Sequence, residues 1–331
     1  MSDPIHPWIQ PLRADGRYAN PGASANRGWA EVLRWKLTSK PTPWPRTVAV
    51  AVTDAPAEPA RGARVAWVGH ATFLIRVPGC TVLVDPVWSE RIGPFGGCVG
   101  IRRVHPPAIR WGTLPDIDAV LLSHDHYDHC DLPTLRRISR RWPRARLVTP
   151  EGYADLARRA GFAAGRHAEL SWWSEAVLPG DVRLTATPAR HWTNRLSGKR
   201  NGRLWSGWHL RVGDGTTVLF TGDTARDDVM FKQIHARLGA PGLALIPIGA
   251  YEPRWFMCNQ HCNPAEAVMI HRDLGARRSV AMHWGTFQMT DEGREEPRAE
   301  LQKALLAAGV SPEVFIAPEP GAVIEVERTA Q

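Results

Sequence analysis

Metal-binding side chains are unusually dense in one short stretch near the middle of the chain. Three histidines and two aspartates fall within the run His124-Asp125-His126-Tyr127-Asp128-His129. Imidazole nitrogen and carboxylate oxygen are ligands that a catalytic zinc ion takes in proteins. His124 and His126 alternate and can reach one ion, whereas Asp128 and His129 follow a turn and can face a second. The run therefore predicts a metal centre.

Further ligands are expected where other apolar segments end. His191 follows residues 182–187, Asp223 follows residues 217–221, and His283 ends the segment 279–283. A sheet places such ends on one rim, which is where sites on α/β scaffolds form. Each residue alone is equally well explained as a surface cap or a hydrogen-bonded core group. Together with the central run, they predict a shared site.

The elements that position these residues are predicted from hydrophobic periodicity. Strands are expected at residues 63–68, 72–77, 81–84, 117–122, 146–149, 182–187, 208–212, 217–221, 243–248, 279–283, 314–316 and 322–326. Helices are expected at residues 132–141, 153–159, 228–238, 264–274 and 297–308. The sequence Asn263-Pro264-Ala265-Glu266 has the cap, proline and glutamate of a strong helix start. This order predicts a mixed α/β sandwich with its helices outside.

Two regions differ in composition. Residues 1–60 are rich in proline and glycine and are expected to form an irregular arm that packs on the core, with one helical patch at residues 29–37. Residues 61–331 are expected to form one domain that carries the metal centre.

Bulk composition excludes several classes of protein. Hydrophobic residues make up 44% of the 331 residues and charged residues 22%, which is ordinary for a globular protein. No segment approaches the roughly 18 apolar residues of a membrane span, and the start lacks the apolar run of a signal peptide. We therefore expect a cytoplasmic protein. Its five cysteines are an odd number, which argues against a disulfide framework. The net charge of +8 could attract phosphates, nucleic acid or anionic membrane, or could reflect genome composition.

The pattern His124-x-His126-x-Asp128-His129, followed by His191, Asp223 and His283, resembles the signature of the metallo-β-lactamase superfamily. The resemblance implies an αββα sandwich with two metal ions between its sheets. It further implies one ion on His124, His126 and His191, a second on Asp128, His129 and His283, and Asp223 as the bridge. A water or hydroxide between the ions would then be the nucleophile.

A narrower resemblance covers most of the chain. The segments Trp67-Val68-Gly69-His70-Ala71-Thr72 and Asp85-Pro86 are similar to the lipid-hydrolase and sugar-lactonase branch. Residues 246–257, Gln260-His261 and residues 283–287 resemble the phospholipases D that hydrolyse N-acylphosphatidylethanolamine. This implies a phosphodiesterase that releases phosphatidic acid and N-acylethanolamine. Two divalent ions are expected, and zinc suits these ligands best, with Mn²⁺ and Fe²⁺ as alternatives.

Further roles are assigned by chemistry. Asp223 would fix the metal separation, and Asp128 could also orient the hydroxide, so both are candidate catalytic residues. His261 could donate a proton to the leaving oxygen or contact the phosphate, or simply hydrogen-bond its loop. Pocket lining and core packing explain the aromatic side chains of Tyr251, Trp255 and Phe256 equally well. His70 and Asp85 are candidates for orienting the ligands by hydrogen bonds.

Functions other than that of a phospholipase are compatible with this ligand set. A lactonase acting on a sugar phosphate, or a nuclease or other phosphodiesterase, could use the same ligands. The aromatic loop at residues 251–256 argues against a sugar lactonase, and no RNA-gripping insertion is evident, so nucleic acid is not an expected partner. The complete ligand set argues against a third reading, a membrane- or nucleic-acid-binding protein with a vestigial site.

A lipid-cleaving enzyme must reach its substrate, so peripheral contact with the inner, anionic face of the membrane is expected. One route is the basic amphipathic helix at residues 132–142, whose arginines surround Leu135, Ile138 and Trp142. The alternative for this helix is an ordinary surface helix packed on the sheet. The arm at residues 29–37 is the rival contact.

Overall fold

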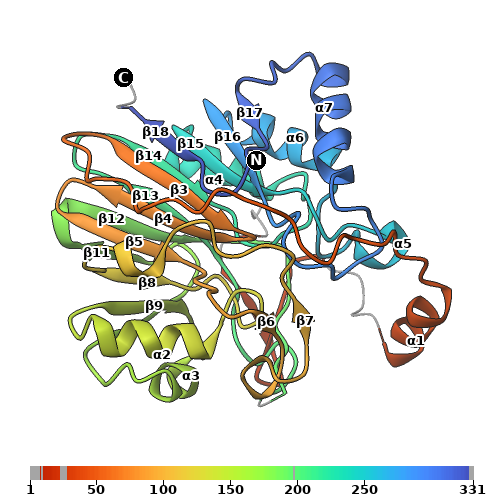
Figure 1. Ribbon diagram of the computed structural model, residues 1–331, viewed down its shortest axis with the longest axis horizontal. Helices are drawn as coiled ribbons and strands as arrows, with labels where there is room; N and C mark the ends of the chain where they lie inside the picture. The colour runs from red at the N-terminus through yellow and green to blue at the C-terminus, as the bar shows by residue number, and fades with distance from the viewer. Residues whose placement is uncertain (1–7, 9, 23–27, 197, 328–331) are drawn as a thin grey trace, which may run out of the picture.

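The computed structural model describes residue 8 and residues 10–22, 28–196 and 198–327, and it contains two facing β-sheets with helices outside them (Figure 1). The first sheet has the order β10 (His167–Leu170), β9 (Arg146–Pro150), β8 (Ala119–Leu121), β5 (Cys80–Val84), β4 (Thr72–Val77), β3 (Ala63–Gly69), β18 (Val323–Val326). The second has the order β11 (Glu175–Leu178), β12 (Val182–Thr187), β13 (Gly207–Arg211), β14 (Thr217–Phe220), β15 (Leu243–Pro247), β16 (Arg278–Met282), β17 (Phe315–Ile316). The predicted αββα sandwich is confirmed.

Seven α-helices are present in the described part of the chain. They are α1 (Trp29–Thr38), α2 (Leu132–Arg141), α3 (Ala154–Arg159), α4 (Met230–Leu238), α5 (Arg254–Met257), α6 (Pro264–Asp273) and α7 (Glu296–Ala308). In α6 the expected capping box forms, because the Asn263 side chain accepts from the backbone N–H of Glu266, and the Glu266 carboxylate accepts from that of Asn263. The predicted helices agree with the structure to within two residues at each end.

The core divides along the two faces of the first sheet. In β3, Val65 and Trp67 pack toward the second sheet, whereas Ala66 and Val68 pack toward α2 and α3. This alternation arises because successive side chains of a strand point to opposite faces. Both faces are therefore apolar, which fixes the strand register and with it the positions of the strand ends.

Several short elements were not predicted. β10 and β11 lie at sheet edges, and their partly exposed sequences HAEL and EAVL lack an apolar run. Two hairpins also went unpredicted, β1 (Leu12–Ala14) with β2 (Arg17–Ala19), and β6 (Arg91–Ile92) with β7 (Ile101–Arg102). Edge strands and short ribbons receive their stability from tertiary neighbours, so local pattern carries little signal for them.

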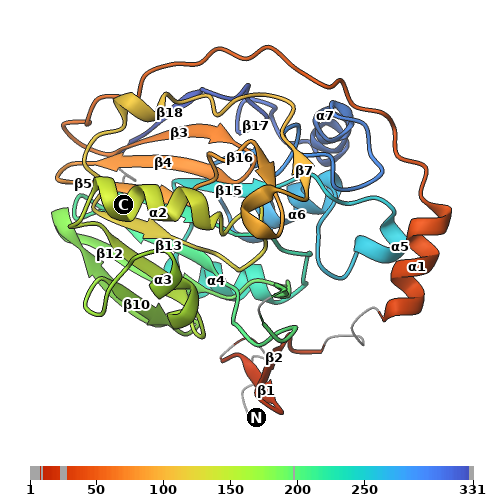
Figure 2. The same cartoon turned by 60° about the horizontal axis from the view of Figure 1, so that its bottom comes forward.

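The arm packs on the core through α1, which lies beside α5 (Figure 2). The rings of Trp35 and Phe256 stack with their centroids 4.8 Å apart. After α1, Ser39 donates a hydrogen bond to Asp291, and the Trp44 indole donates to the carbonyl of Glu292. The arm was predicted as residues 1–60, of which residues 1–7, 9 and 23–27 lie outside the described part.

The basic helix α2 is packed as an ordinary surface helix. Leu135, Ile138 and Trp142 are buried among the apolar residues between this helix and the first sheet. Arg137 and Arg141 lie over the ring of Trp111. The apolar face of α2 is thus occupied by the protein itself. Among the described helices, none has the length and apolar character that crossing a bilayer requires.

Candidate metal centre

The predicted ligands come together where strands of both sheets end. His124, His126, Asp128 and His129 follow β8 of the first sheet, and His191, Asp223 and His283 follow β12, β14 and β16 of the second. Neighbouring strands of the second sheet approach each other closely at this edge. A Cβ atom on Gly249, which follows β15, would lie 2.1 Å from the carbonyl oxygen of His283, so only glycine fits there.

One group of ligand atoms is made of histidines. The Nδ1 atom of His126 lies 2.9 Å from Nε2 of His124 and 3.3 Å from Nε2 of His191. All three rings present a nitrogen to one point, within the spacing that a single metal ion spans. This is the trio for which the sequence predicted one ion.

A second group combines carboxylate and imidazole. The Oδ2 atom of Asp128 lies 3.3 Å from Nε2 of His129 and 3.3 Å from Nε2 of His283. It also accepts a hydrogen bond of 2.8 Å from Nε2 of His70. His70 therefore contacts the predicted ligand Asp128 directly, and its nitrogen lies close enough to belong to the group itself.

Asp223 lies between the two groups. Its Oδ2 atom is 3.7 Å from Nε2 of His124 and 3.8 Å from Nε2 of His191 on one side. On the other side, it is 3.2 Å from Nε2 of His129 and 3.0 Å from Nε2 of His283. A single carboxylate thus reaches both sets of histidines, as a bridging ligand would.

Hydrogen bonds outside the cluster fix which nitrogen faces inward in three of its rings. Nδ1 of His129 donates to Oδ2 of Asp85 at 2.7 Å, and Nδ1 of His191 donates to the carbonyl oxygen of Gln260 at 2.9 Å. Nδ1 of His124 is 2.9 Å from the Ser123 hydroxyl, which itself donates to Asp85. Each bond leaves Nε2 free to bind an ion. Asp85 thus supports the cluster, as the sequence suggested.

Burial and charge make the cluster a strong cation site. Burial lowers the pKa of His126 to about 4 and that of His191 to about 3. Both rings are therefore neutral at pH 7, and each has a nitrogen lone pair that can bind a metal ion. Burial also disfavours protonation of His283, but Asp223 and Asp128 outweigh it and raise its pKa to about 9. Two buried carboxylates attract positive charge here, and a divalent ion can take the place of a proton.

The backbone is strained at three positions around the site. His70, Asp85 and His283 have φ angles of 52°, 42° and 62°, in the left-handed region that non-glycine residues rarely adopt. Such conformations cost about 1–3 kcal/mol each and persist where surrounding structure enforces them. The backbone N–H of His283 donates to the carbonyl of His70 at 3.0 Å, which couples two of these residues.

A pocket of about 920 Å³ opens over the cluster. His126, Asp128, Asp223, His261 and His283 lie in its lining. Most of the remaining walls are apolar, and they come from distant segments: Val32 and Trp35 of α1, Ile92 of β6, Ile101 of β7, Trp192, Phe256, Met257 and Met289.

The pocket includes only some of the residues predicted to bind substrate. Phe256 and His261 line it, whereas Tyr251 and Trp255 do not. Tyr251 is buried, and its hydroxyl donates to Glu296, while Trp255 lies under the guanidinium of Arg34. Arg17 and Arg200 line the pocket and were not predicted.

Sequence reasoning also missed the support of Asp125, which lies between two predicted ligands. Its side chain is buried, and Oδ2 accepts a hydrogen bond of 2.9 Å from Nη1 of Arg203, while Oδ1 accepts from the backbone N–H of Asn194. Arg203 also pairs with Asp155 of α3. The metal-binding run is thereby tied to the outer helical layer.

Comparisons with known proteins agree with this geometry. A family model described as "Beta-lactamase superfamily domain" matches residues 80–284. The N-acyl-phosphatidylethanolamine-hydrolyzing phospholipase D 1 of Caenorhabditis elegans is 41% identical over 246 residues, which are 72% of this chain and 68% of that protein. A mitochondrial protein of the same description from Saccharomyces cerevisiae is 32% identical over 245 residues, 71% of this chain and 50% of that protein.

Among solved structures, a metallo hydrolase from Ignicoccus hospitalis superimposes with a TM-score of 0.58 at 23% identity. The match covers 81% of this chain and 99% of the other. At this identity, the likeness concerns the fold alone.

Proposed function

Because this chain belongs to the β-lactamase superfamily and is a metal-dependent hydrolase, we propose that it is a binuclear phosphodiesterase of phospholipase D type. Its substrates would be N-acylphosphatidylethanolamine-type phospholipids, and its products phosphatidic acid and N-acylethanolamine. The observation that carries this proposal is the wide, mostly apolar pocket directly over the histidine and aspartate cluster. The relative from Caenorhabditis elegans, named for this reaction, adds support.

The residues present fit two divalent ions, most simply zinc. His124, His126 and His191 would hold one, Asp128, His129 and His283 the other, and Asp223 would bridge them. Among the described residues, Nε2 of His129, Nε2 of His283 and Oδ1 of Asp223 are buried without a hydrogen-bond partner. Buried polar atoms normally have a hydrogen-bond partner, so these unpaired atoms are an argument for bound ions. Such ions would lower the pKa of water and neutralise the charge of the phosphate.

The chain's own residues would bind and orient the lipid. Apolar walls from α1, the β6–β7 hairpin and α5 suit an acyl chain, and they come from segments on both sides of the cluster. The guanidinium groups of Arg17 and Arg200 in the same lining could contact the phosphodiester. Arg200 lies over the ring of Trp192, with its Cζ atom 4.3 Å from the ring centroid, which limits the directions it can take.

His261 is the candidate that serves the leaving group. It is buried beside His191 and His283, with ring centroids 5.0 and 5.4 Å away, and its Nδ1 has no hydrogen-bond partner among the described residues. An N–H at this atom could donate to a phosphate oxygen or to the departing ethanolamide oxygen. Asp128 and Asp223 would orient the attacking water through their free lone pairs.

Membrane contact is proposed at α1 rather than α2. Leu33 and Leu37 of α1 are 60% and 76% exposed, although Val32 and Trp35 of the same helix line the pocket. A helix with one face at the pocket and leucines toward solvent suits the boundary between headgroups and acyl chains. Lipid entering from a bilayer would then meet the pocket at this helix.

The reaction is tested by product analysis in ¹⁸O water. With N-acylphosphatidylethanolamine, we expect phosphatidic acid and N-acylethanolamine, with the label on the phosphatidic acid because water attacks phosphorus. Mass spectrometry of both products measures this. Label confined to the ethanolamide would mean carbon–oxygen cleavage and contradict the mechanism. Intact lipid alongside rapid opening of a sugar-phosphate lactone would replace the proposed substrate class.

A second prediction concerns His70, which would position Asp128. His70→Asn removes the bond to Asp128 but keeps a residue that tolerates a positive φ. Loss of such a supporting bond lowers metal affinity by about 10–100-fold. Competition with a chelator measures the affinity. His167→Asn, on edge strand β10, is the matched control and should leave it unchanged. Equal affinities for the wild type and His70→Asn would remove the positioning role.

A further inference from the structure

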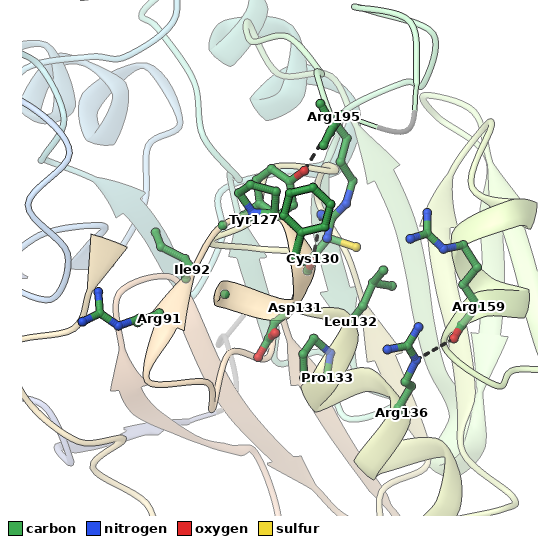
Figure 3. Close-up of a pocket in the computed structure, with 16 residues that line it drawn as sticks. Arg91, Ile92, Tyr127, Cys130, Asp131, Leu132, Pro133, Arg136, Arg159 and Arg195 are labelled. Carbon is green, nitrogen blue, oxygen red and sulfur yellow. Dashed lines mark hydrogen bonds between the residues drawn. The ribbon is translucent and has the colours of Figure 1, made fainter. Parts of the chain in front are cut away.

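A second pocket lies beside the metal pocket, between the segment that follows β6 and the N-terminal end of α2 (Figure 3). Its volume is about 530 Å³. The two pockets have four lining residues in common: Ile92, Gly93, Pro94 and Tyr127. Nothing in the proposed reaction uses this second pocket, although only this thin wall separates the two.

The charge of the second pocket is strongly positive. Four arginines line it, Arg91, Arg136, Arg159 and Arg195, against the single carboxylate of Asp131. That carboxylate is buried and is engaged by the N–H of Ser89 and the hydroxyl of Thr134. In Figure 3, Arg136 and Arg159 lie side by side on one wall, Arg195 descends from another, and Arg91 lies opposite.

Three of these arginines bond to neutral oxygens rather than to acids. Nη1 of Arg91 donates to the carbonyl oxygen of Gly100 at 3.1 Å. Nε of Arg136 donates to the carbonyl oxygen of Arg159 at 2.9 Å. Nη1 of Arg195 donates to the carbonyl oxygens of Asp125 and Cys130, and its guanidinium lies over the Tyr127 ring, 4.1 Å from the centroid. Neither Arg136 nor Arg195 forms an ion pair with a carboxylate of the described residues. Arg195 nevertheless lies close enough to Asp125 and Asp131 to favour the ionised forms of both carboxyl groups, so its charge is partly balanced. The charge of Arg136 is held in place by its bond to a neutral oxygen and is exposed, which favours an anionic ligand.

The rim of the same pocket is apolar and exposed. Phe95 and Leu196 both line it, yet their side chains are 74% and 72% exposed. Val99, in the same β6–β7 loop as Phe95, is also exposed. Exposed apolar side chains around a basic pocket match a ligand with a charged head and an apolar body at the surface of a bilayer.

We propose that this pocket binds the phosphate headgroup of an anionic glycerophospholipid, with Phe95 and Leu196 inserted among the neighbouring acyl chains. Guanidinium groups pair with phosphate oxygens through two parallel N–H bonds, and a headgroup held there would lie next to the metal pocket. The occupied pocket would keep the mouth of the metal pocket against the membrane. This inference concerns binding and is independent of which ester is cleaved.

Calorimetric titration with dioctanoyl phosphatidic acid below its micelle concentration tests the proposal. Arg136→Ala should weaken binding by about tenfold, which is about 1.4 kcal/mol, because it removes a charged hydrogen-bond donor to the phosphate. The matched control is Arg140→Ala, which removes the same charge from an exposed position of α2 outside the pocket and should change binding by less than about twofold. Equal losses in both variants would reduce the effect to general electrostatics and overturn the proposal.

Further titrations distinguish a lipid headgroup from free phosphate, and binding in the arginine-lined pocket from binding in the metal pocket. Dioctanoyl phosphatidylcholine and inorganic phosphate should both bind more weakly than the phosphatidic acid; equal binding of inorganic phosphate would overturn the lipid assignment. An oligonucleotide that binds more tightly than the lipid would do the same. The titration is repeated with Asp223→Ala, whose metal pocket is expected to be impaired. Binding that persists there belongs to the arginine pocket, whereas binding that vanishes belongs to the metal site and contradicts the inference.

Sedimentation with phosphatidylcholine vesicles, with and without phosphatidic acid, places the contact on the surface. Phe95→Glu and Leu196→Glu should each weaken binding to the anionic vesicles, and hydrogen exchange of residues 91–97 should slow when vesicles bind. If these changes have no effect while Leu33→Glu and Leu37→Glu abolish binding, the bilayer contact is confined to α1 and the arginine pocket plays no part.

Discussion

Replacement of Asp223 by alanine is expected to remove bound metal and turnover together, with kcat falling by about a thousandfold or more. A metal ion contributes several kcal/mol of charge stabilisation in hydrolysis, and each 1.4 kcal/mol corresponds to a tenfold change in rate. Asp223 has this leverage because one carboxylate oxygen lies 3.0–3.8 Å from four histidines that belong to both proposed ion sites. Removing any single histidine would disturb only one of them.

Elemental analysis of protein purified without added metal measures the first effect, and the wild type should contain close to two ions per chain. Asp228→Ala is the matched control, because Asp228 lies in the same loop but its side chain is exposed. It should retain both metal and activity. An Asp223→Ala protein that loses its metal yet turns over substrate at the wild-type rate would refute the metal mechanism.

The meeting of the predicted ligands at one place could be expected from the sequence, because they lie at the ends of apolar strands. Asp223 follows β14 and His283 follows β16, and the apolar runs before them define those strands almost to the residue. Once two sheets face each other, such ends meet at one edge. Strand periodicity and residue type together therefore indicate where in the fold the site lies.

The pocket was much less predictable, because its walls are set by packing between distant segments. Trp35 belongs to an arm whose only sequence signal was a short helical patch, yet it stacks on Phe256 over the site. Tyr251 just before α5 and Phe256 within it look alike as candidates, but Tyr251 donates to Glu296 and Phe256 lines the pocket. Side-chain direction in an irregular loop depends on long-range contacts that periodicity does not record.

Buried ion pairs could not be predicted from the sequence either, because their partners come from distant segments. Asp125 is flanked by ligands, and its type alone suggests another ligand. In the structure its partner is Arg203, distant in sequence and just before β13. The strong effect expected for this pair follows from burial, because a charge left alone in the interior cannot recover its hydration.

Arg203→Leu is expected to destabilise the protein by about 3–5 kcal/mol, the cost of breaking a buried pair by removing one partner. Within the described part of the chain, the change leaves the N–H of Asn194 as the one remaining hydrogen-bond donor to the buried Asp125 carboxylate, with Arg195 as a more distant charge, and it also removes the partner of Asp155. Urea unfolding of metal-free protein measures the loss without a contribution from bound ions. Arg64→Leu breaks the exposed pair with Glu325 and should cost less than about 1 kcal/mol.

The double variant Arg203→Leu with Asp125→Asn separates charge from packing. An amide at position 125 is uncharged, so removing Arg203 no longer leaves an unpaired buried charge. Part of the stability lost in Arg203→Leu should therefore return. If the single and double variants are equally destabilised, the loss comes from the packing of the arginine side chain, and Asp125 is not held by charge. Recovery of stability accompanied by recovery of metal affinity would instead mean that the Asp125–Arg203 pair fixes the loop that carries His124 and His126.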